Sequence, residues 1–582
     1  MELSPCTFGN EDHLPRVPLP TLDETCERFL EWCTPLLTPA ELATTEKAVA
    51  AFRTGPGSNL HAALEADDAR DDTASWLDAF WEYRYLGRRD RIALNANFFF
   101  LFEDSPLGQI ERAARLVAAA VAYKRLIDDE TLPPVLQRGQ PLSMEQNKYL
   151  FSATRIPGDP QDSSRNPYSD AWPGPSRARH ILVLHDGNPL AVDVIAPDGR
   201  PYAVDEIAAG LRAALAASGT RGPALGHLTT KARAEWAVGR ATLLEANAAA
   251  LDTLETALFC LCLEDSTPES PLQASDQLLH GDSGNRWFDK SVSLIVFADG
   301  TAGYNGEHCN LDGTTVIGFL DSVLEAPEPT DPAGEGAIPV VAPIGFVLDD
   351  ALRADVAASG KAFADYAADT ATSTLAVDFS AERAKALKCS PDAFAQMAFQ
   401  LAHVRAKGHV GATYESIATR AFKHGRTEAM RVVTPEILAF TGAMDDAGAD
   451  TETRRSAFRA AADKHVARAK ECQAGLAPEQ HLWELALIAA RRGDAVDPLY
   501  GSPGWTVMRD DYLSTSAVPS PHVHFWGFGS TSEKCIGVGY AMMPGRFNLY
   551  LSTPRAVSAQ MGTFAAAVTD AVRELEELLT DG

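Results

Sequence analysis

A predicted hairpin that leads to a histidine is the feature that most constrains the fold of this chain. Residues Ser291–Phe297 have the alternating pattern of a β-strand and are followed by Asp299-Gly300, a dipeptide typical of tight turns between antiparallel strands. The second arm leads to His308, which we expect at a strand end, over a cleft. Asp312 stands four residues later. A carboxylate at this spacing can hold an imidazole that acts as a general base.

The spacing of His308 and Asp312 has more than one interpretation. A short H-x-x-x-D-G pattern is also found where a core histidine only makes structural hydrogen bonds. Asp312 has its own alternative, because it could brace the loop through an arginine instead of facing the imidazole. Motifs elsewhere in the chain favour the functional interpretation of His308.

Several longer motifs follow one another in a definite order. They are Thr154-Arg155-Ile156-Pro157-Gly158, Asn285–Ser291, Thr413–Ser416, Phe422–Glu428 and Leu513–Ser516. In this order and spacing the chain resembles the choline/carnitine O-acyltransferases, most closely the carnitine palmitoyltransferase branch. The resemblance runs from Leu14-Pro15-Arg16 to about Ser552. It implies acyl transfer between coenzyme A and the hydroxyl of a small alcohol, with acyl-CoA as a substrate, no permanently bound cofactor and no metal.

The mixture of strand and helix patterns predicts an α/β fold. We expect helices over 22–86, 203–218 and 242–262, a hairpin over 180–194, strands over 525–551, and a helix that begins after Ser390 and stops at Gly408. The resemblance implies two related lobes, each a mixed β-sheet packed with helices, with an active-site tunnel between them. We expect an N-terminal lobe at 1–345, which carries the histidine, and a C-terminal lobe at 346–582. A passage over 325–338 joins the lobes, and helical residues 1–90 are candidates to pack on the C-terminal lobe.

The bulk properties of the chain exclude several classes of partner. The net charge of −28 argues against nucleic acid or an anionic membrane, since both require clustered Lys and Arg. The nine cysteines show no disulfide-framework spacing, which favours a reducing compartment. No apolar run approaches the length of a membrane span, and the N-terminal residues fit neither a secretory signal nor a transit peptide. We therefore expect a cytoplasmic monomer whose partners are acyl-CoA and a small alcohol acceptor.

The attack of an alcohol on a thioester needs a base, an oxyanion donor and close alignment of two substrates. His308 is expected to remove the acceptor proton and then to protonate the departing thiolate. Ser514-Thr515-Ser516 lacks the context of a nucleophilic serine, so no acyl-enzyme is expected. The resemblance assigns Ser516 to the oxyanion and Ser514 to the acceptor side, although a polar strand end is the simpler interpretation of these residues. In the family, the position of Asp312 pairs with the arginine that matches Arg426.

A basic segment, Arg383–Lys388, precedes the helix that begins after Ser390 and suits a phosphate group. The resemblance places Lys385 and Asp392 at positions that contact coenzyme A. Lys388 is a further candidate, with a solvated charged turn as its alternative. Ala381 stands where the family has a second lysine, so we expect phosphate binding to be weaker or shifted.

The predicted acceptor site fits neither branch of the family. Carnitine enzymes hold a carboxylate with a tyrosine, a threonine and an arginine; Tyr414 and Thr427 match the first two, but Gln480 replaces the arginine. A glutamine supplies neither the charge nor the bidentate fork. Choline enzymes also lack this arginine, yet they carry valine where Thr427 stands. Ala429 replaces a second threonine of the carnitine pattern.

Four further residues complete the predicted site. Tyr85 is family-like, and Arg84 beside it could supply a replacement cation. Phe528 matches an aromatic residue near the trimethylammonium group, with core packing as its alternative. Trp526 falls where long-chain relatives have glycine, so a short acyl group is favoured unless the indole turns away. Two rival functions remain open: acyl transfer to an unrelated alcohol, and a non-catalytic acyl-CoA-binding protein.

Overall fold

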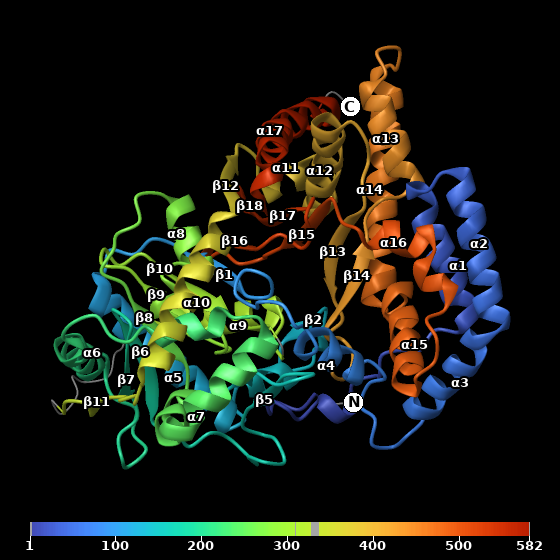
Figure 1. The fold of residues 1–582 in the computed structure, drawn as a ribbon. Coiled ribbons are helices and arrows are strands. Elements are labelled where there is room, and N and C mark those ends of the chain that lie inside the picture. The colour runs from blue at the N-terminus through green and yellow to red at the C-terminus, as the bar shows by residue number, and fades with distance from the viewer. Residues whose placement is uncertain (1–2, 309, 328–336, 581–582) are drawn as a thin grey trace.

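Two mixed β-sheets, each packed with helices, organise the molecule. The computed structural model describes residues 3–308, 310–327 and 337–580. The first sheet has the order β11-β7-β6-β8-β9-β10-β1-β16 and the second β12-β18-β17-β15-β13-β14, and both contain parallel and antiparallel pairs. The expected α/β fold with two mixed sheets is confirmed (Figure 1). The strands of the first sheet are β1 (Phe98–Phe102), β6 (His180–His185), β7 (Asn188–Asp193), β8 (Cys260–Leu263), β9 (Ser293–Val296), β10 (Ala302–Gly306), β11 (Val341–Pro343) and β16 (Val523–Phe528).

The second sheet is covered by helices from the C-terminal half of the chain. Its strands are β12 (Thr370–Val377), β13 (Thr413–Ala418), β14 (Thr427–Arg431), β15 (Leu513–Ala517), β17 (Ile536–Met543) and β18 (Arg546–Pro554). Nearby helices are α11 (Ala381–Ala386), α12 (Pro391–Lys407), α13 (Pro435–Asp445), α14 (Thr451–Gln473), α15 (Pro478–Arg492), α16 (Pro503–Arg509) and α17 (Ser558–Thr580). The first sheet is packed with α5 (Gln109–Asp128), α6 (Val204–Ser218), α7 (Arg233–Thr256), α8 (Pro271–Leu279), α9 (Gly313–Leu324) and α10 (Asp350–Ala368).

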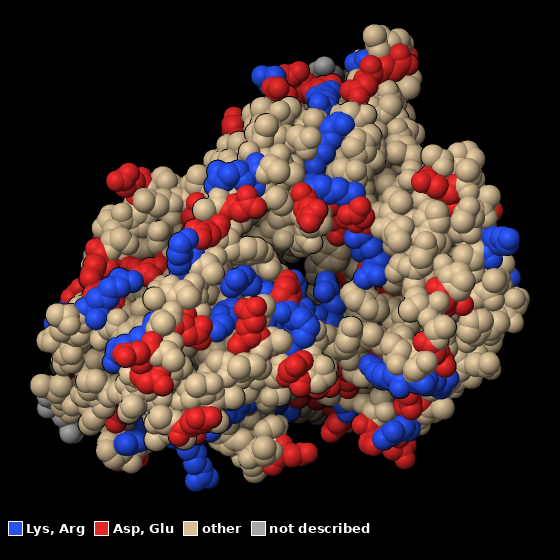
Figure 2. Space-filling model, viewed as in Figure 1, with Lys and Arg blue, Asp and Glu red and all other residues tan. Residues whose placement is uncertain are grey.

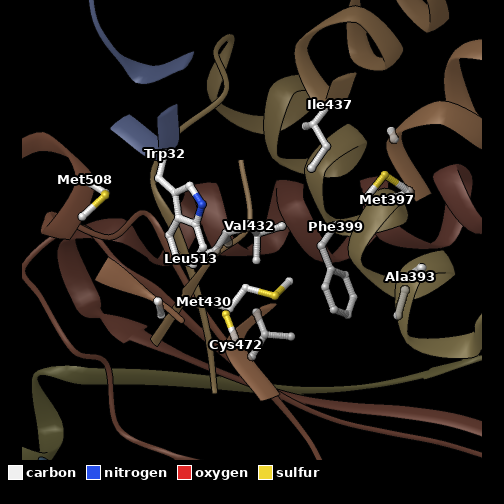
Figure 3. Packing of buried hydrophobic residues seen from close by; sticks show 14 of the residues in the cluster. Trp32, Ala393, Met397, Phe399, Met430, Val432, Ile437, Cys472, Met508 and Leu513 are labelled. Atoms are coloured by element: carbon white, nitrogen blue, oxygen red, sulfur yellow. The ribbon is translucent and has the colours of Figure 1, made fainter. Parts of the chain in front are cut away.

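The N-terminal helices belong to the core of the second half. They are α1 (Leu22–Cys33), α2 (Pro39–Thr54), α3 (Pro56–Asp68) and α4 (Asp78–Leu86), and Figure 1 shows the first three beside α15 and α16. Thr21 and Thr38 each form a capping box that fixes where α1 and α2 begin. Trp32 of α1 is fully buried and lies in one cluster with Met508 and Leu513 (Figure 3). Burial of such a large ring ties the N-terminal segment firmly to the second half.

One strand crosses between the two halves. β16 comes from the C-terminal part of the chain, yet it pairs antiparallel with β1 at the edge of the first sheet, with Phe98 opposite Phe528 and Phe100 opposite Trp526. Each sheet therefore contains residues from its own half, and the first also holds a strand of the second. The lobe boundary at 345/346 stays a prediction.

The predicted hairpin before His308 is present. β9 and β10 pair antiparallel, with Val296 opposite Ala302. Gly300 has a φ of 87°, a left-handed conformation that favours glycine in this turn. The hairpin of β6 and β7 and the helix that ends at Gly408 are also confirmed.

The expected helix over 242–262 is wrong at both ends. α7 begins at Arg233 and ends at Thr256, and Cys260–Leu263 form β8 in the middle of the first sheet. A short apolar run buried on both faces is typical of such a central strand and has no alternation that would distinguish it from a helix. Part of the predicted passage at 325–338 lies outside the described residues.

Candidate active site

The imidazole of His308 is held between two aromatic rings, in the loop between β10 and α9. Its ring stacks on Tyr85 with a centroid distance of 4.7 Å and meets Phe98 edge to face with a centroid distance of 5.1 Å. The Tyr85 hydroxyl is 3.5 Å from Nε2. The side chain is 25% exposed, so part of the ring remains reachable. The aromatic contacts restrict the orientation of the imidazole, and only the long contact from the Tyr85 hydroxyl involves a ring nitrogen.

Asp312 is anchored mainly by Arg426 and Gln146. Arg426 donates to its two carboxylate oxygens at 3.1 and 3.0 Å, and to the His308 carbonyl at 3.3 Å. Gln146 donates to the same carboxylate at 2.8 Å and accepts from the Asp312 backbone N–H. The Nδ1 atom of His308 lies 3.6 Å from Oδ1, which is longer than a hydrogen bond. This geometry favours the bracing interpretation of Asp312, with the carboxylate as an ionic neighbour of the imidazole.

The electrostatic environment keeps His308 neutral. Burial is the largest influence and lowers the pKa of the imidazole; Asp312 and Glu307 act in the opposite direction, and Arg426 lowers the pKa further. Burial is the largest single influence on Asp312 and disfavours its charged form, but Arg426, His308 and Gln146 together outweigh it, so the pKa of Asp312 is lowered. A neutral imidazole beside an ionised carboxylate can accept a proton at neutral pH.

Ser514 and Ser516 lie on the face of β15 that points away from α12. The hydroxyl of Thr515, between them, donates to the Tyr414 carbonyl and accepts from Gln396 of α12. Because side chains alternate along a strand, both serines point to the opposite face. Tyr414 of β13 is aligned with Ser514 and shares this face. The structure therefore brings Tyr414, Ser514 and Ser516 together on one surface of the second sheet.

Thr427, Gln480 and Phe528 border the same surface. Thr427 is aligned with Ala418 on β13, which places it on the face of Tyr414. Gln480 is buried; its amide nitrogen donates to the Thr427 carbonyl at 2.8 Å, while its oxygen has no hydrogen-bond partner among the described residues. A Cβ on Gly537 would lie 3.3 Å from the Phe528 ring, so the glycine leaves room for this ring beside Ser514.

Arg84 stands one residue before Tyr85, on the same helix. Its guanidinium lies 5.3 Å from the ring centre of Trp483. Burial raises the pKa of Tyr85 and of Tyr414, and the nearby charge of Arg84 acts against that rise. Within the described ranges no carboxylate comes within ion-pair distance of Arg84, and nearby Glu479 forms ion pairs with Arg431 and Arg509.

Trp526 fills the aromatic cluster that leads to His308. Its ring lies 5.9 Å from Phe100 and 5.6 Å from Phe528, and its indole N–H donates to the Tyr540 carbonyl at 3.0 Å. Phe98 contacts both Phe100 and His308. The indole is therefore buried in the core beside the residues that hold the imidazole.

The predicted coenzyme segment lies apart from His308, around α11 and the start of α12. In this otherwise acidic protein, Figure 2 shows Lys and Arg side chains gathered over this part of the surface. Arg459 of α14 donates to the carbonyls of Leu387 and Lys388 at 2.7 and 3.0 Å. In the part of the chain that the structure describes, Lys385, Lys388 and Arg459 form no ion pair. Arg459 is a cation near this segment that the sequence interpretation missed.

Asp392 is partly exposed and belongs to a polar network whose other members, Glu415 and His465, are buried. Its carboxylate accepts a hydrogen bond from Tyr540 and lies 3.0 Å from His465, while Glu415 lies on the other side of the Tyr540 hydroxyl. One carboxylate oxygen each of Asp392 and Glu415 and one imidazole nitrogen of His465 lie within 4.8 Å of one another. Burial raises the pKa of Glu415 well above its ordinary value, so a proton on this carboxyl accounts for the close approach of two acids.

Four residues around His308 were not predicted as site residues. Gln146 contacts Asp312 and Phe98 contacts His308, and no sequence pattern predicts either contact. Glu307 directly precedes the histidine, and Arg155 stands in the Thr154–Gly158 motif, so position in a motif was an available signal for both. Figure 2 shows a hollow between the two halves, with charged side chains around its mouth.

The profile of the Choline/Carnitine o-acyltransferase family matches residues 17–570, and the chain belongs to this family. It is 34% identical to carnitine O-palmitoyltransferase 2, mitochondrial, from Rattus norvegicus, over 92% of this chain and 87% of that enzyme. It is 31% identical to carnitine O-acetyltransferase from Columba livia, over 93% and 89% of the two chains.

Among solved structures, a trichothecene 15-O-acetyltransferase from Fusarium sporotrichioides is 12% identical, with 84% of this chain and 92% of that chain covered and a TM-score of 0.38.

Family membership confirms the expected class. The chain is an acyl-CoA-dependent O-acyltransferase that acts between coenzyme A and a carnitine-type hydroxyl, with acyl-CoA as a substrate. None of the described helices is long and apolar enough to cross a membrane. The cytoplasmic location and the monomeric state stay predictions.

Proposed function

We propose that the protein transfers a short acyl group between coenzyme A and a small alcohol of the carnitine/choline type, with His308 as general base in a ternary complex. The observation that carries this proposal is the environment of His308. Its imidazole is partly exposed, fixed between Tyr85 and Phe98, and has a lowered pKa. These are the properties that a base needs at neutral pH.

In the proposed reaction the acceptor oxygen attacks the thioester carbonyl while His308 takes the hydroxyl proton through Nε2. The carbonyl electrons move to the oxygen, and the Ser516 hydroxyl donates to the oxyanion. When the tetrahedral species collapses, the carbon–sulfur bond breaks and the imidazolium returns its proton to the departing sulfur. Asp312, which Arg426 and Gln146 hold, favours the imidazolium in between.

Release of free thiol from acetyl-CoA tests the proposal directly. We expect acceptor-dependent release with one or more members of a panel of carnitine, choline and related amino alcohols, and only slow release without an acceptor. A panel extended to polyols tests the alternative of an unrelated alcohol, which Gln480 and Ala429 favour. If no acceptor raises the rate above hydrolysis, the transfer activity is wrong for these alcohols, and the rival of a non-catalytic acyl-CoA-binding protein gains.

The indole of Trp526 is proposed to limit the length of the acyl chain. It occupies a buried site next to Phe100 and Phe528, and a close-packed ring leaves no space for a methylene chain. We expect Trp526→Gly to extend activity from acetyl-CoA to octanoyl- and palmitoyl-CoA, measured as kcat/KM for the three substrates. Trp526→Phe serves as a matched control with intermediate volume. A wild-type preference for palmitoyl-CoA would show that the indole is no barrier.

The acceptor is proposed to bind without the arginine that carnitine enzymes use. Gln480 supplies a neutral amide that is already bonded to the Thr427 carbonyl. A neutral hydrogen bond contributes about 0.5–1.5 kcal/mol, against about 1.5–3 kcal/mol for one to a charged group. Carnitine should therefore be a poor substrate, and Gln480→Arg should raise its kcat/KM by about tenfold. The kcat/KM for choline, which has no carboxylate, should not rise.

A low-micromolar KM for carnitine in the wild type would contradict this expectation and point to another cation. Arg84 is the best candidate, because it lies near Tyr414 and lacks an ion pair among the described residues. Arg84→Gln would then raise the KM for carnitine more than the KM for choline. An equal change for both acceptors would exclude Arg84 as the carboxylate partner.

A further inference from the structure

We propose that Arg155 is a positioning residue for His308, which it holds in place by clamping the backbone of Tyr85 and the side chain of Glu307. The inference rests on the proposed role of His308 as the base. Arg155 does not touch the imidazole, but the two residues that it binds flank His308. Tyr85 stacks on the imidazole, and Glu307 directly precedes His308 in the sequence.

The guanidinium of Arg155 uses all three of its nitrogen atoms. Nη1 donates to Glu307 Oε1 at 2.8 Å, Nη2 to the Tyr85 carbonyl at 2.7 Å, and Nε to Asp162 Oδ2 at 2.7 Å. Arg155 is 1% exposed and Glu307 2%. A buried charge of this kind is tolerated only with full pairing, so each contact is expected to be well defined.

The clamp is itself fixed in space. Arg155 lies on β4 (Thr154–Ile156), which pairs with β5 (Ser163–Arg165), and its backbone N–H donates to the Asp289 carbonyl. Asp162 also accepts from Arg89 and Arg233, at 2.9 and 2.6 Å. Asp162 is therefore fixed in place, and its bond to Nε keeps the guanidinium of Arg155 in one orientation.

Arg155 joins the two halves of the molecule at the catalytic histidine. Tyr85 lies in the last turn of α4, which packs on the second half through Phe80 and Trp483 (5.4 Å between ring centres). Glu307 follows β10 of the first sheet. Figure 1 shows α4 between the two halves. Loss of the clamp should let the Tyr85 ring and the His308 loop shift relative to each other, and a shift of about 1 Å can cost about 10²-fold in rate.

Charge gives the clamp a second, measurable consequence. The groups that act on His308 are Asp312, Glu307, Arg426 and the Tyr85 ring. The Glu307 carboxylate favours the imidazolium and so raises the pKa of His308, while Arg155 compensates that carboxylate. Removal of Arg155 should therefore raise the pKa of His308, and removal of the Glu307 charge should lower it.

Three variants separate positioning from charge. Arg155→Gln removes the clamp and its charge. Glu307→Gln removes a charge, but its amide oxygen can still accept from Nη1. Arg155→Lys retains the charge, but its compact ammonium cannot reproduce the planar fork that reaches the three separate acceptors. Deuterium exchange at the histidine C2–H, followed by mass spectrometry, gives the pKa of His308 in each protein without requiring turnover, and thermal unfolding reports whether the fold survives.

We expect Arg155→Gln to lower kcat by about 10²-fold and to move the acid limb of kcat/KM, and the exchange midpoint of His308, to higher pH. Glu307→Gln should move both to lower pH with a smaller loss of kcat. Arg155→Lys should leave the midpoint close to that of the wild type and give an intermediate kcat. Midpoints that stay unchanged, or that move in the same direction in Arg155→Gln and Glu307→Gln, would overturn the inference.

A failure of the inference can be distinguished from a failure of the proposed function. If the wild type releases no thiol with any acceptor, the proposed function fails, and the opposite displacements of the His308 exchange midpoint still decide for or against the clamp. If the wild type turns over but the midpoints of the variants coincide, only the clamp is wrong.

Discussion

His308→Ala should abolish acyl transfer, with a loss of at least 10²–10⁴-fold in kcat (roughly the contribution of a general base), because no other described group in contact with this site is placed to take the acceptor proton. Tyr85 is the nearest polar neighbour, at 3.5 Å, but burial raises the pKa of its hydroxyl, which therefore stays protonated and cannot take the acceptor proton. The measurement is thiol release from acetyl-CoA at saturating acceptor. The acid limb of the pH profile should disappear together with the activity.

The fold and coenzyme binding should survive this change, because the imidazole packs against two rings without a structural hydrogen bond to either ring nitrogen shorter than 3.5 Å. Thermal unfolding and binding of coenzyme A are the controls. His13→Ala, at an exposed histidine of the N-terminal segment, is a matched substitution that should leave turnover unchanged. Turnover near the wild-type rate in folded His308→Ala protein would disprove the mechanism.

Ser516→Ala should lower kcat by about 10²–10³-fold while it changes the KM of either substrate little. The proposed hydrogen bond becomes strong only when negative charge develops on the carbonyl oxygen, so its loss affects the transition state more than the bound substrates. The measurement is the separate determination of kcat and KM for acetyl-CoA and for the acceptor.

Ser514→Ala is a matched control from the same face of the same strand, two residues away. Because Ser514 is assigned to the acceptor side, its loss should raise the acceptor KM more than it lowers kcat. If Ser516→Ala raised KM alone, Ser516 would be a ground-state contact. If the two variants gave the same pattern, the distinction between the serines would be wrong.

Local pattern predicted much of what surrounds His308. The alternation before Asp299-Gly300 located β9 and β10, and an N1 proline and Gly408 bounded α12. The resemblance supplied Tyr85 and Arg426, which the structure brings into contact with His308 and Asp312. These features depend on short-range chemistry or on motifs, so one sequence is enough to indicate them.

Features that depend on long-range packing were not predictable. β8 has the same apolar run that a buried helix could have, and only its neighbours in the sheet decide between the two. Gln146 lies 166 residues from Asp312 in sequence, and its amide makes a bond that no periodicity encodes. Arg155 was part of a motif, but its three partners lie at three separate places in the chain.

The path of β16 has a consequence for how substrates enter. This strand carries Trp526 and Phe528 from the second half, and its backbone pairs with β1, whose Phe98 touches the catalytic imidazole. A jaw-like opening of the halves would have to break this ladder of main-chain hydrogen bonds, at a cost that thermal motion does not supply during each turnover. We therefore expect acyl-CoA and the alcohol to reach His308 through openings at the boundary between the two halves. The paired strands β16 and β1 should stay together throughout the catalytic cycle.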